Sequence, residues 1–217
     1  MIGFTRALVL LHRTFRRHPL AQRVHILGRF LTAPFLRTLD LVPVGARVLD
    51  VGAGHGLLAR LLVEERASEV VAVDPDLRKI LTAWNDPRVR FVAGFDPCIR
   101  GTFDAVTVYD VLYRLSPQDR DALIARMRDR LEPGGILVIK DLDPGARIKA
   151  RWNRMQERVA DFFHLTAGNY GENDSPEAMR GRLERAGFDE IEQRRIDNGY
   201  AHAHIVYVAR KRYHRQA

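Results

Sequence analysis

The residues with the clearest chemical meaning are three glycines that alternate through positions 52–56. They follow the apolar run Val48-Leu49-Asp50-Val51 and precede leucines spaced for one face of a helix. Where a strand ends in alternating glycines that lead into a helix, the backbone carries no side chains there, so a ligand can approach it closely. The segment therefore supplies candidate cofactor-binding residues, namely Asp50, Gly52, Ala53, Gly54 and Gly56.

The spacing of these glycines indicates the kind of ligand. A dinucleotide fingerprint, G-x-G-x-x-G, would need a third glycine at position 57, where this chain has Leu57. The observed G-x-G-x-G spacing suits the close approach of a nucleoside joined to an amino acid, without a pyrophosphate. Glycine turns after strands also occur for packing reasons, and this alternative stays open.

Two further acidic positions follow β-rich runs. Asp74 ends the second run, 22 residues beyond Gly52, where a carboxylate can accept hydrogen bonds from both ribose hydroxyls. With Pro75 it could also begin a helix as an N-cap. Phe95 and Asp96 follow the third run, where an aromatic ring could cover an adenine and a carboxylate could bind its amino group. A solvated turn beside Pro97 explains Asp96 equally well.

The elements that position these residues alternate along the chain from position 47. Short β-rich runs separated by helical stretches indicate βαβ units and a parallel sheet. The last two runs have no room for a helix between them and predict an antiparallel hairpin. The fold class is therefore α/β, a doubly wound, mostly parallel seven-stranded sheet of the Rossmann-like kind. The expected strands are 48–51, 70–73, 89–92, 103–109, 136–139, 190–196 and 204–209.

The remaining helices are also predicted from local signals. Ser116-Pro117 and Ser175-Pro176 each resemble a capped helix start. The first of these helices is expected to run past Leu131 until Pro133-Gly134-Gly135 stops it. Another helical region is expected at 148–164.

The first forty residues form a separate feature, read as one or two helices. Residues 1–39 contain seven arginines and no acidic residue, which accounts for +7 of the net charge of +8. We expect residues 1–40 to be a helical lid segment on a domain at 41–217. The segment could instead contact a membrane surface or nucleic acid, since basic amphipathic helices and arginine-rich arms do both.

Four stretches, in order, resemble the class I methyltransferases that depend on S-adenosylmethionine (SAM). They are VLDVGAGHG at 48–56, VVAVDPD at 70–76, FDAVTVYDVLYRL at 103–115 and LEPGGILVIKD at 131–141. The resemblance implies SAM as cofactor, with Gly52, Gly54 and Gly56 flanking its methionine part. It further implies that Asp74 and Pro75 lie at the ribose, Phe95 and Asp96 at the adenine, and Asp110 near the sulfonium.

The catalytic residues are not determined by this resemblance. His164 and Tyr113 are weak candidates for a general base, and His202 and His204 border the same region. Methyl transfer depends more on alignment than on acid–base help, so an enzyme is expected without a recognisable triad. No metal ligand set is apparent, although Asp141 and Asp143 follow the fifth run. Metal dependence is not expected.

The acceptor is expected to be a small molecule. The segment 145–175 is aromatic and basic, and its composition favours an apolar acceptor such as a lipid, isoprenoid or polyketide-like metabolite. A nucleic-acid-binding or nucleic-acid-modifying protein that uses the arginine-rich N-terminus is the alternative. The single cysteine and the short N-terminal apolar run lead us to expect a cytoplasmic protein, with membrane association through residues 1–39 as an open option.

Overall fold

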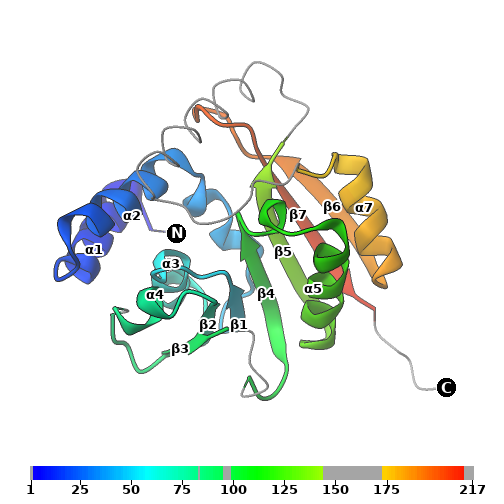
Figure 1. Ribbon diagram of the computed structural model, residues 1–217, viewed down its shortest axis with the longest axis horizontal. Coiled ribbons are helices and arrows are strands. Elements are labelled where there is room, and N and C mark those ends of the chain that lie inside the picture. Colours follow the sequence, from blue (N-terminus) through cyan, green and yellow to red (C-terminus); the bar gives the residue numbers. More distant parts are fainter. Residues whose placement is uncertain (1, 83, 95–98, 144–172, 213–217) are drawn as a thin grey trace.

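The computed structural model describes residues 2–82, 84–94, 99–143 and 173–212. Its centre is a seven-stranded sheet in the order β3-β2-β1-β4-β5-β7-β6 (Figure 1). Neighbouring strands from β3 through β5 are parallel, and β7 runs antiparallel to both β5 and β6. The predicted fold class and its closing hairpin are therefore confirmed. The strands are β1 (Arg47–Val51), β2 (Glu69–Asp74), β3 (Val89–Ala93), β4 (Phe103–Tyr109), β5 (Leu131–Leu142), β6 (Phe188–Arg195) and β7 (His204–Lys211).

Helices cover both faces of this sheet. Alternate strand residues point to opposite faces, and they enter two hydrophobic clusters. Val48 packs in the cluster that contains the first three α-helices, whereas Leu49 packs in the cluster that contains α5 and α7. The helices are α1 (Phe4–Phe15), α2 (Leu20–Thr32), α3 (Leu57–Glu65), α4 (Leu77–Leu81), α5 (Pro117–Asp129) and α7 (Pro176–Arg185), with 3₁₀ turns η1 (Phe35–Arg37), η2 (Leu39–Leu41) and η3 (Leu112–Arg114).

The N-terminal helices pack on α3 as part of the main core. Leu11 and Phe15 of α1 and Ile26 and Phe30 of α2 are buried in the same cluster as the strands. At the surface, Arg6 reaches Glu64 of α3 across 3.4 Å.

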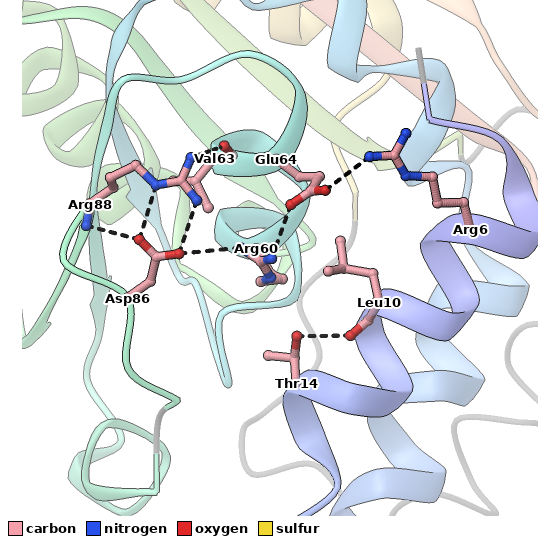
Figure 2. Close-up of polar contacts among 8 residues, drawn as sticks. All are labelled: Arg6, Leu10, Thr14, Arg60, Val63, Glu64, Asp86 and Arg88. Atoms are coloured by element: carbon pink, nitrogen blue, oxygen red, sulfur yellow. Dashed lines mark hydrogen bonds and ion pairs between the residues drawn. The ribbon is translucent and has the colours of Figure 1, made fainter.

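A chain of ion pairs continues from this contact, as Figure 2 shows. Arg60 pairs with Glu64 at 3.0 Å and with Asp86 at 3.4 Å. Arg88 in turn pairs with Asp86 at 3.0 Å and donates to the Val63 carbonyl. Helix α1 is thereby tied through α3 to the segment that leads into β3.

Local signals placed some elements correctly and others not. Ser116 and Ser175 cap α5 and α7 as predicted, because each hydroxyl accepts a backbone N–H three residues on. Helix α5 ends at Asp129, however, before the predicted stop, since Leu131 already pairs with Phe103 in the sheet.

The interpretation of Asp74-Pro75 as a helix start is wrong. Helix α4 begins at Leu77, and its N-cap is Asp76, whose carboxylate accepts from the Arg78 N–H. The helix expected at 148–164 lies outside the described residues.

Candidate functional site

The candidate site lies where β1, β2 and β4 end together. Val51 is in register with Val73 of β2 and with Val108 of β4, so the loops that follow these strands share one edge of the sheet. In open α/β sheets, ligands bind outside the carboxyl ends of the strands where the strand order reverses. This edge therefore brings together the glycine turn, Asp74 and Asp110.

The three glycines of the turn serve different purposes. All have positive φ angles, of 75° at Gly52, 60° at Gly54 and 81° at Gly56, which glycine adopts without strain. A Cβ atom at Gly52 would lie 2.2 Å from a methyl of Val111, and one at Gly56 would lie 2.6 Å from the Phe91 ring. A Cβ atom at Gly54 would meet nothing within 4 Å. Close packing thus explains two of the glycines, and only Gly54 borders open space.

Asp74 holds the turn in shape. Its side chain is buried, with one carboxylate oxygen accepting from the Gly54 N–H at 2.8 Å and the other from the Asp76 N–H at 2.9 Å. Lys79 lies 3.6 Å from the second oxygen. Each carboxylate oxygen can accept more than one hydrogen bond, so both retain capacity for a ligand hydroxyl.

Asp50 is the most deeply buried acid of the turn. It is 2% exposed, and its Oδ1 accepts from the Thr107 hydroxyl at 2.9 Å. Burial raises the pKa of Asp50 to about 7, although the Thr107 hydrogen bond opposes this shift. Its Oδ2 is buried and has no hydrogen-bond partner among the described residues. Buried polar atoms in native proteins nearly always have a partner, so this oxygen is a candidate to bind a ligand or an ordered water.

A second group of charges surrounds Asp110, directly after β4. Asp110 has a positive φ of 59°, and its backbone N–H donates to the Lys140 carbonyl. Its two carboxylate oxygens lie 2.7 Å from Lys140 Nζ and 2.7 Å from an Arg29 guanidinium nitrogen. Burial alone would raise the pKa of Asp110, but the positive charges of Lys140 and Arg29 outweigh it and hold this pKa below its ordinary value.

Arg29 and Lys140 are site residues that the sequence interpretation missed. Arg29 comes from the face of α2 that meets the sheet, and Lys140 is a fully buried lysine in β5. The sequence did contain a signal for Lys140, since a lysine within the apolar run 136–142 takes an inward strand position.

The remaining residues that the sequence predicts for the site lie partly within and partly outside the described residues. Tyr113 lies in η3, where its hydroxyl accepts from Arg114 at 3.0 Å, and burial raises the pKa of this hydroxyl. Ala53 is partly buried against the core, and Pro75 is exposed just beyond Asp74. Phe95, Asp96 and His164 lie outside the described residues.

Acidic residues near the end of β5 do not form a metal site in the described part of the chain, where no cluster of three or more His, Cys, Asp or Glu could hold an ion. The sequence predicts that Asp141 follows the fifth strand, but it lies within β5, because the strand extends to Leu142. Burial first and the Asp110 charge second raise the pKa of Asp141 to about 7.

None of the described helices has the length and apolar character needed to cross a bilayer.

The sequence profile of the methyltransferase-domain family matches residues 22–193. This range includes both the glycine turn and the charged group around Asp110. The chain belongs to the class I SAM-dependent methyltransferases. SAM is the cofactor of this family, as the four sequence stretches implied.

Individual relatives agree with this assignment. The chain is 30% identical over 168 residues to demethylspheroidene O-methyltransferase of Rhodobacter capsulatus, covering 74% of this chain and 40% of that protein. It is 37% identical over 112 residues to a ubiquinone biosynthesis O-methyltransferase of Xanthomonas axonopodis pv. citri, covering 48% and 46% of the two chains. The chain thus matches less than half the length of either curated relative.

A solved structure of this fold contains the cofactor. Human N-acetylserotonin methyltransferase in complex with SAM superposes with a TM-score of 0.67 at 16% identity, covering 94% of this chain and 59% of that one. At this identity the likeness concerns the fold alone.

Proposed function

We propose that this methyltransferase transfers the methyl group of SAM to a hydroxyl oxygen of a small apolar acceptor of the isoprenoid class. The observation that carries the proposal is the shared edge of β1, β2 and β4. The glycine turn at this edge contains an open glycine position and a buried carboxylate oxygen that has no partner among the described residues. These features fit a cofactor that combines a nucleoside with a charged amino acid.

The residues of the edge have distinct proposed roles toward SAM. Gly54 leaves room for its methionine part, and Asp50 Oδ2 is available to a hydrogen-bond donor there. Asp74 uses its remaining lone pairs on the ribose hydroxyls, and Asp110 borders the sulfonium side. Phe95 and Asp96 stay candidates for the adenine on the strength of the resemblance. Bound SAM supplies a methyl group that is already activated, so the protein has to bind and align.

The acceptor class is supported by the relatives and by composition. The two curated relatives are named as O-methyltransferases, one for demethylspheroidene and one in ubiquinone biosynthesis. We infer from these two names that an isoprenoid hydroxyl is the acceptor to test first for this chain. The aromatic composition of 145–175 favours the same kind of acceptor in this chain.

Residues 1–40 are proposed to cover the site on one side and to contact anionic lipid on the other. On α2, Arg29 reaches inward to Asp110, whereas Leu20, Val24 and Leu31 lie on one outward stripe and are more than half exposed. The outer surface of both helices is basic and apolar, with exposed Phe4, Val9, Arg6, Arg13, Arg16 and Arg17. Such a surface suits a membrane from which an apolar acceptor would be taken.

The proposed activity is tested by following S-adenosylhomocysteine (SAH) formation from SAM. The acceptor probes are 4-hexylcatechol, which offers phenolic hydroxyls, and geraniol, an isoprenoid alcohol. Acceptor-dependent SAH with a methyl ether as product is the expected result. Methylation of nitrogen compounds or of nucleic acid, with both probes inert, would overturn the proposal.

The proposed membrane surface is tested by sedimentation with vesicles. Binding to phosphatidylglycerol vesicles should exceed binding to phosphatidylcholine vesicles and should weaken with salt, since each arginine near an anionic surface contributes about 1 kcal/mol. The triple change Leu20→Ser, Val24→Ser and Leu31→Ser should reduce this binding. Val44→Ser is the matched control, because Val44 is 75% exposed outside these helices. Equal binding to both vesicle types, or stronger binding to duplex DNA, would contradict the assignment.

A further inference from the structure

A buried histidine lies at the same edge of the sheet and has one ring nitrogen fixed in place. His204 is 3% exposed and begins β7, in register with Leu142 at the end of β5. Its Nε2 lies 3.0 Å from the carbonyl oxygen of Thr32, the last residue of α2. A carbonyl oxygen can only accept, so Nε2 carries the proton of the neutral ring. The lone pair of the ring is therefore on Nδ1.

This Nδ1 is buried and has no hydrogen-bond partner among the described residues. A buried acceptor without a donor costs about 1–3 kcal/mol relative to a satisfied one. A ligand that supplies the donor in the working state would remove this cost. The fixed tautomer further requires that this ligand group be a donor, such as a hydroxyl.

The position of His204 relates it to the methyl-transfer end of the edge. Strand positions two apart share a face, so His204, in register with Leu142, points to the same face as Lys140. Lys140 is paired with Asp110, and the adjacent Val111 touches the first glycine of the turn. His204 thus stands on the far side of Asp110 from the cofactor turn.

We propose that His204 Nδ1 binds the hydroxyl of the acceptor and receives its proton during methyl transfer. The inference rests on the proposed function. In the step, the acceptor oxygen forms a bond to the methyl carbon while the sulfur–methyl bond breaks. The electron pair of that bond stays on sulfur and yields SAH, and the hydroxyl proton moves to Nδ1. The ring leaves the step as an imidazolium and returns its proton to solvent.

The charges around the ring are compatible with this role. Burial first and the Lys140 charge second lower the pKa of His204 to about 4, while Asp110 and the Thr32 carbonyl oppose the shift. The neighbouring loop adds the rings of Tyr200 and His202, each with its centroid 6.0 Å away. The ring is therefore neutral at pH 7 and ready to accept. A hydroxyl that is gaining a methyl group becomes a strong acid, so a weak base suffices to take its proton.

Two substitutions separate a catalytic role from a structural one. In His204→Gln the amide nitrogen can replace Nε2 and keep the Thr32 contact, but the acceptor at Nδ1 is lost. In His204→Asn the amide oxygen can replace Nδ1, but the Thr32 contact is lost. We expect kcat with 4-hexylcatechol to fall about 100-fold or more in His204→Gln and to be partly retained in His204→Asn. SAH affinity should be unchanged in both.

The opposite order, with His204→Gln active and His204→Asn impaired, would assign His204 a structural role and overturn the proposal. The matched control is His12→Gln, the same change at an exposed histidine of α1, and it should leave kcat unchanged.

A second measurement does not depend on turnover. In the full-length protein labelled with ¹⁵N-histidine and saturated with SAH, His204 should be an Nε2–H tautomer, and its Nδ1 resonance should shift when 4-hexylcatechol is added. An Nδ1–H tautomer, or no shift at saturating catechol, would overturn the role of His204 even if methylation proceeds. Conversely, a shift without any turnover would support the site and count against the proposed function.

Discussion

At the glycine turn, Asp74 is held by backbone N–H groups, whereas Asp110 is held by charged side chains from distant segments. Asp74 accepts from backbone N–H groups 20 and 2 residues away, and its charged neighbour Lys79 lies at 3.6 Å from the same short segment. Asp110 pairs with Lys140 and Arg29, 30 and 81 residues away, and His204 meets Thr32 across 172 residues.

The two regions of this edge differ in what holds them together. A cofactor shared by a whole family can be held by backbone geometry, which local sequence encodes. The region around Asp110 is built from groups that α2, β5 and β7 bring together beyond the end of β4, and among them Lys140 and His204 are buried. Buried charge pairs cost desolvation and are sensitive to the loss of one partner. We therefore expect substitutions in the two regions to fail in different ways.

The largest effect is expected at Asp110. Asp110→Asn leaves the Lys140 ammonium, which is 2% exposed, without its counter-charge, and should lower the free energy of unfolding by about 3–5 kcal/mol. Adding Lys140→Met should restore most of the loss, because no buried charge then remains unpaired. Arg29→Gln is the control, since Arg29 is 36% exposed and its loss should cost about 1 kcal/mol or less. Urea unfolding at pH 7.5 measures all four proteins, and equal losses for Arg29→Gln and Asp110→Asn would contradict the comparison.

The next effect separates two glycines of the turn. Gly52→Ala should destabilise the fold by about 3 kcal/mol, because the positive φ is strained and the new Cβ would lie 2.2 Å from Val111. Gly54→Ala should cost about 1 kcal/mol from the φ angle alone, yet it should weaken SAH binding in calorimetry by occupying ligand space. Combining Gly52→Ala with Val111→Ala should recover only the part of the loss that comes from the clash, because the strained φ remains. A Gly54→Ala protein that binds SAH normally would remove Gly54 from the cofactor site.

A smaller effect is expected from Asp74. Asp74→Ala should reduce SAH affinity by roughly 10- to 100-fold, because a hydrogen bond to a charged partner is worth about 1.5–3 kcal/mol. Asp76→Ala provides the control, since this N-cap of α4 should cost about 1 kcal/mol of stability without changing affinity. Calorimetric titration with SAH distinguishes the two, and similar affinities for both variants would refute the ribose role of Asp74.

An effect of similar size, confined to a pH range, is expected at Asp50. Its pKa is raised from 3.8 to about 7 in the fold, so the folded state binds more protons than the unfolded chain between these values. The stability of the wild type is therefore lost as pH rises from 4 to 7, and Asp50→Asn should remove this loss. The variant should gain about 2–3 kcal/mol relative to wild type between pH 5 and pH 8, as judged by urea unfolding. A constant difference across this range would show that Asp50 stays ionised in the fold.

The fold class, the family and the glycine turn could all be predicted without the structure. These depend on local rules: strand runs alternate with helices, glycines permit positive φ, and serine with proline starts a helix. The four motifs appear in the order in which the strands occur. The same local rules failed where the sheet intervened, since pairing with Phe103 takes Leu131 into β5 and ends α5 early.

The side chains that meet beyond the turn could not be predicted, because long-range packing brings them together. The contacts of Arg29, Lys140 and His204 depend on the strand order β4-β5-β7 and on α2 packing over that face. The crossover connections between the strands set this order, and it cannot be predicted from short stretches of sequence. Nor does a sequence specify a histidine tautomer, because Nε2 of His204 is protonated only through its contact with a carbonyl 172 residues away. Backbone conformation is encoded within a few residues, whereas a buried charge or proton is positioned by whatever the completed fold places beside it.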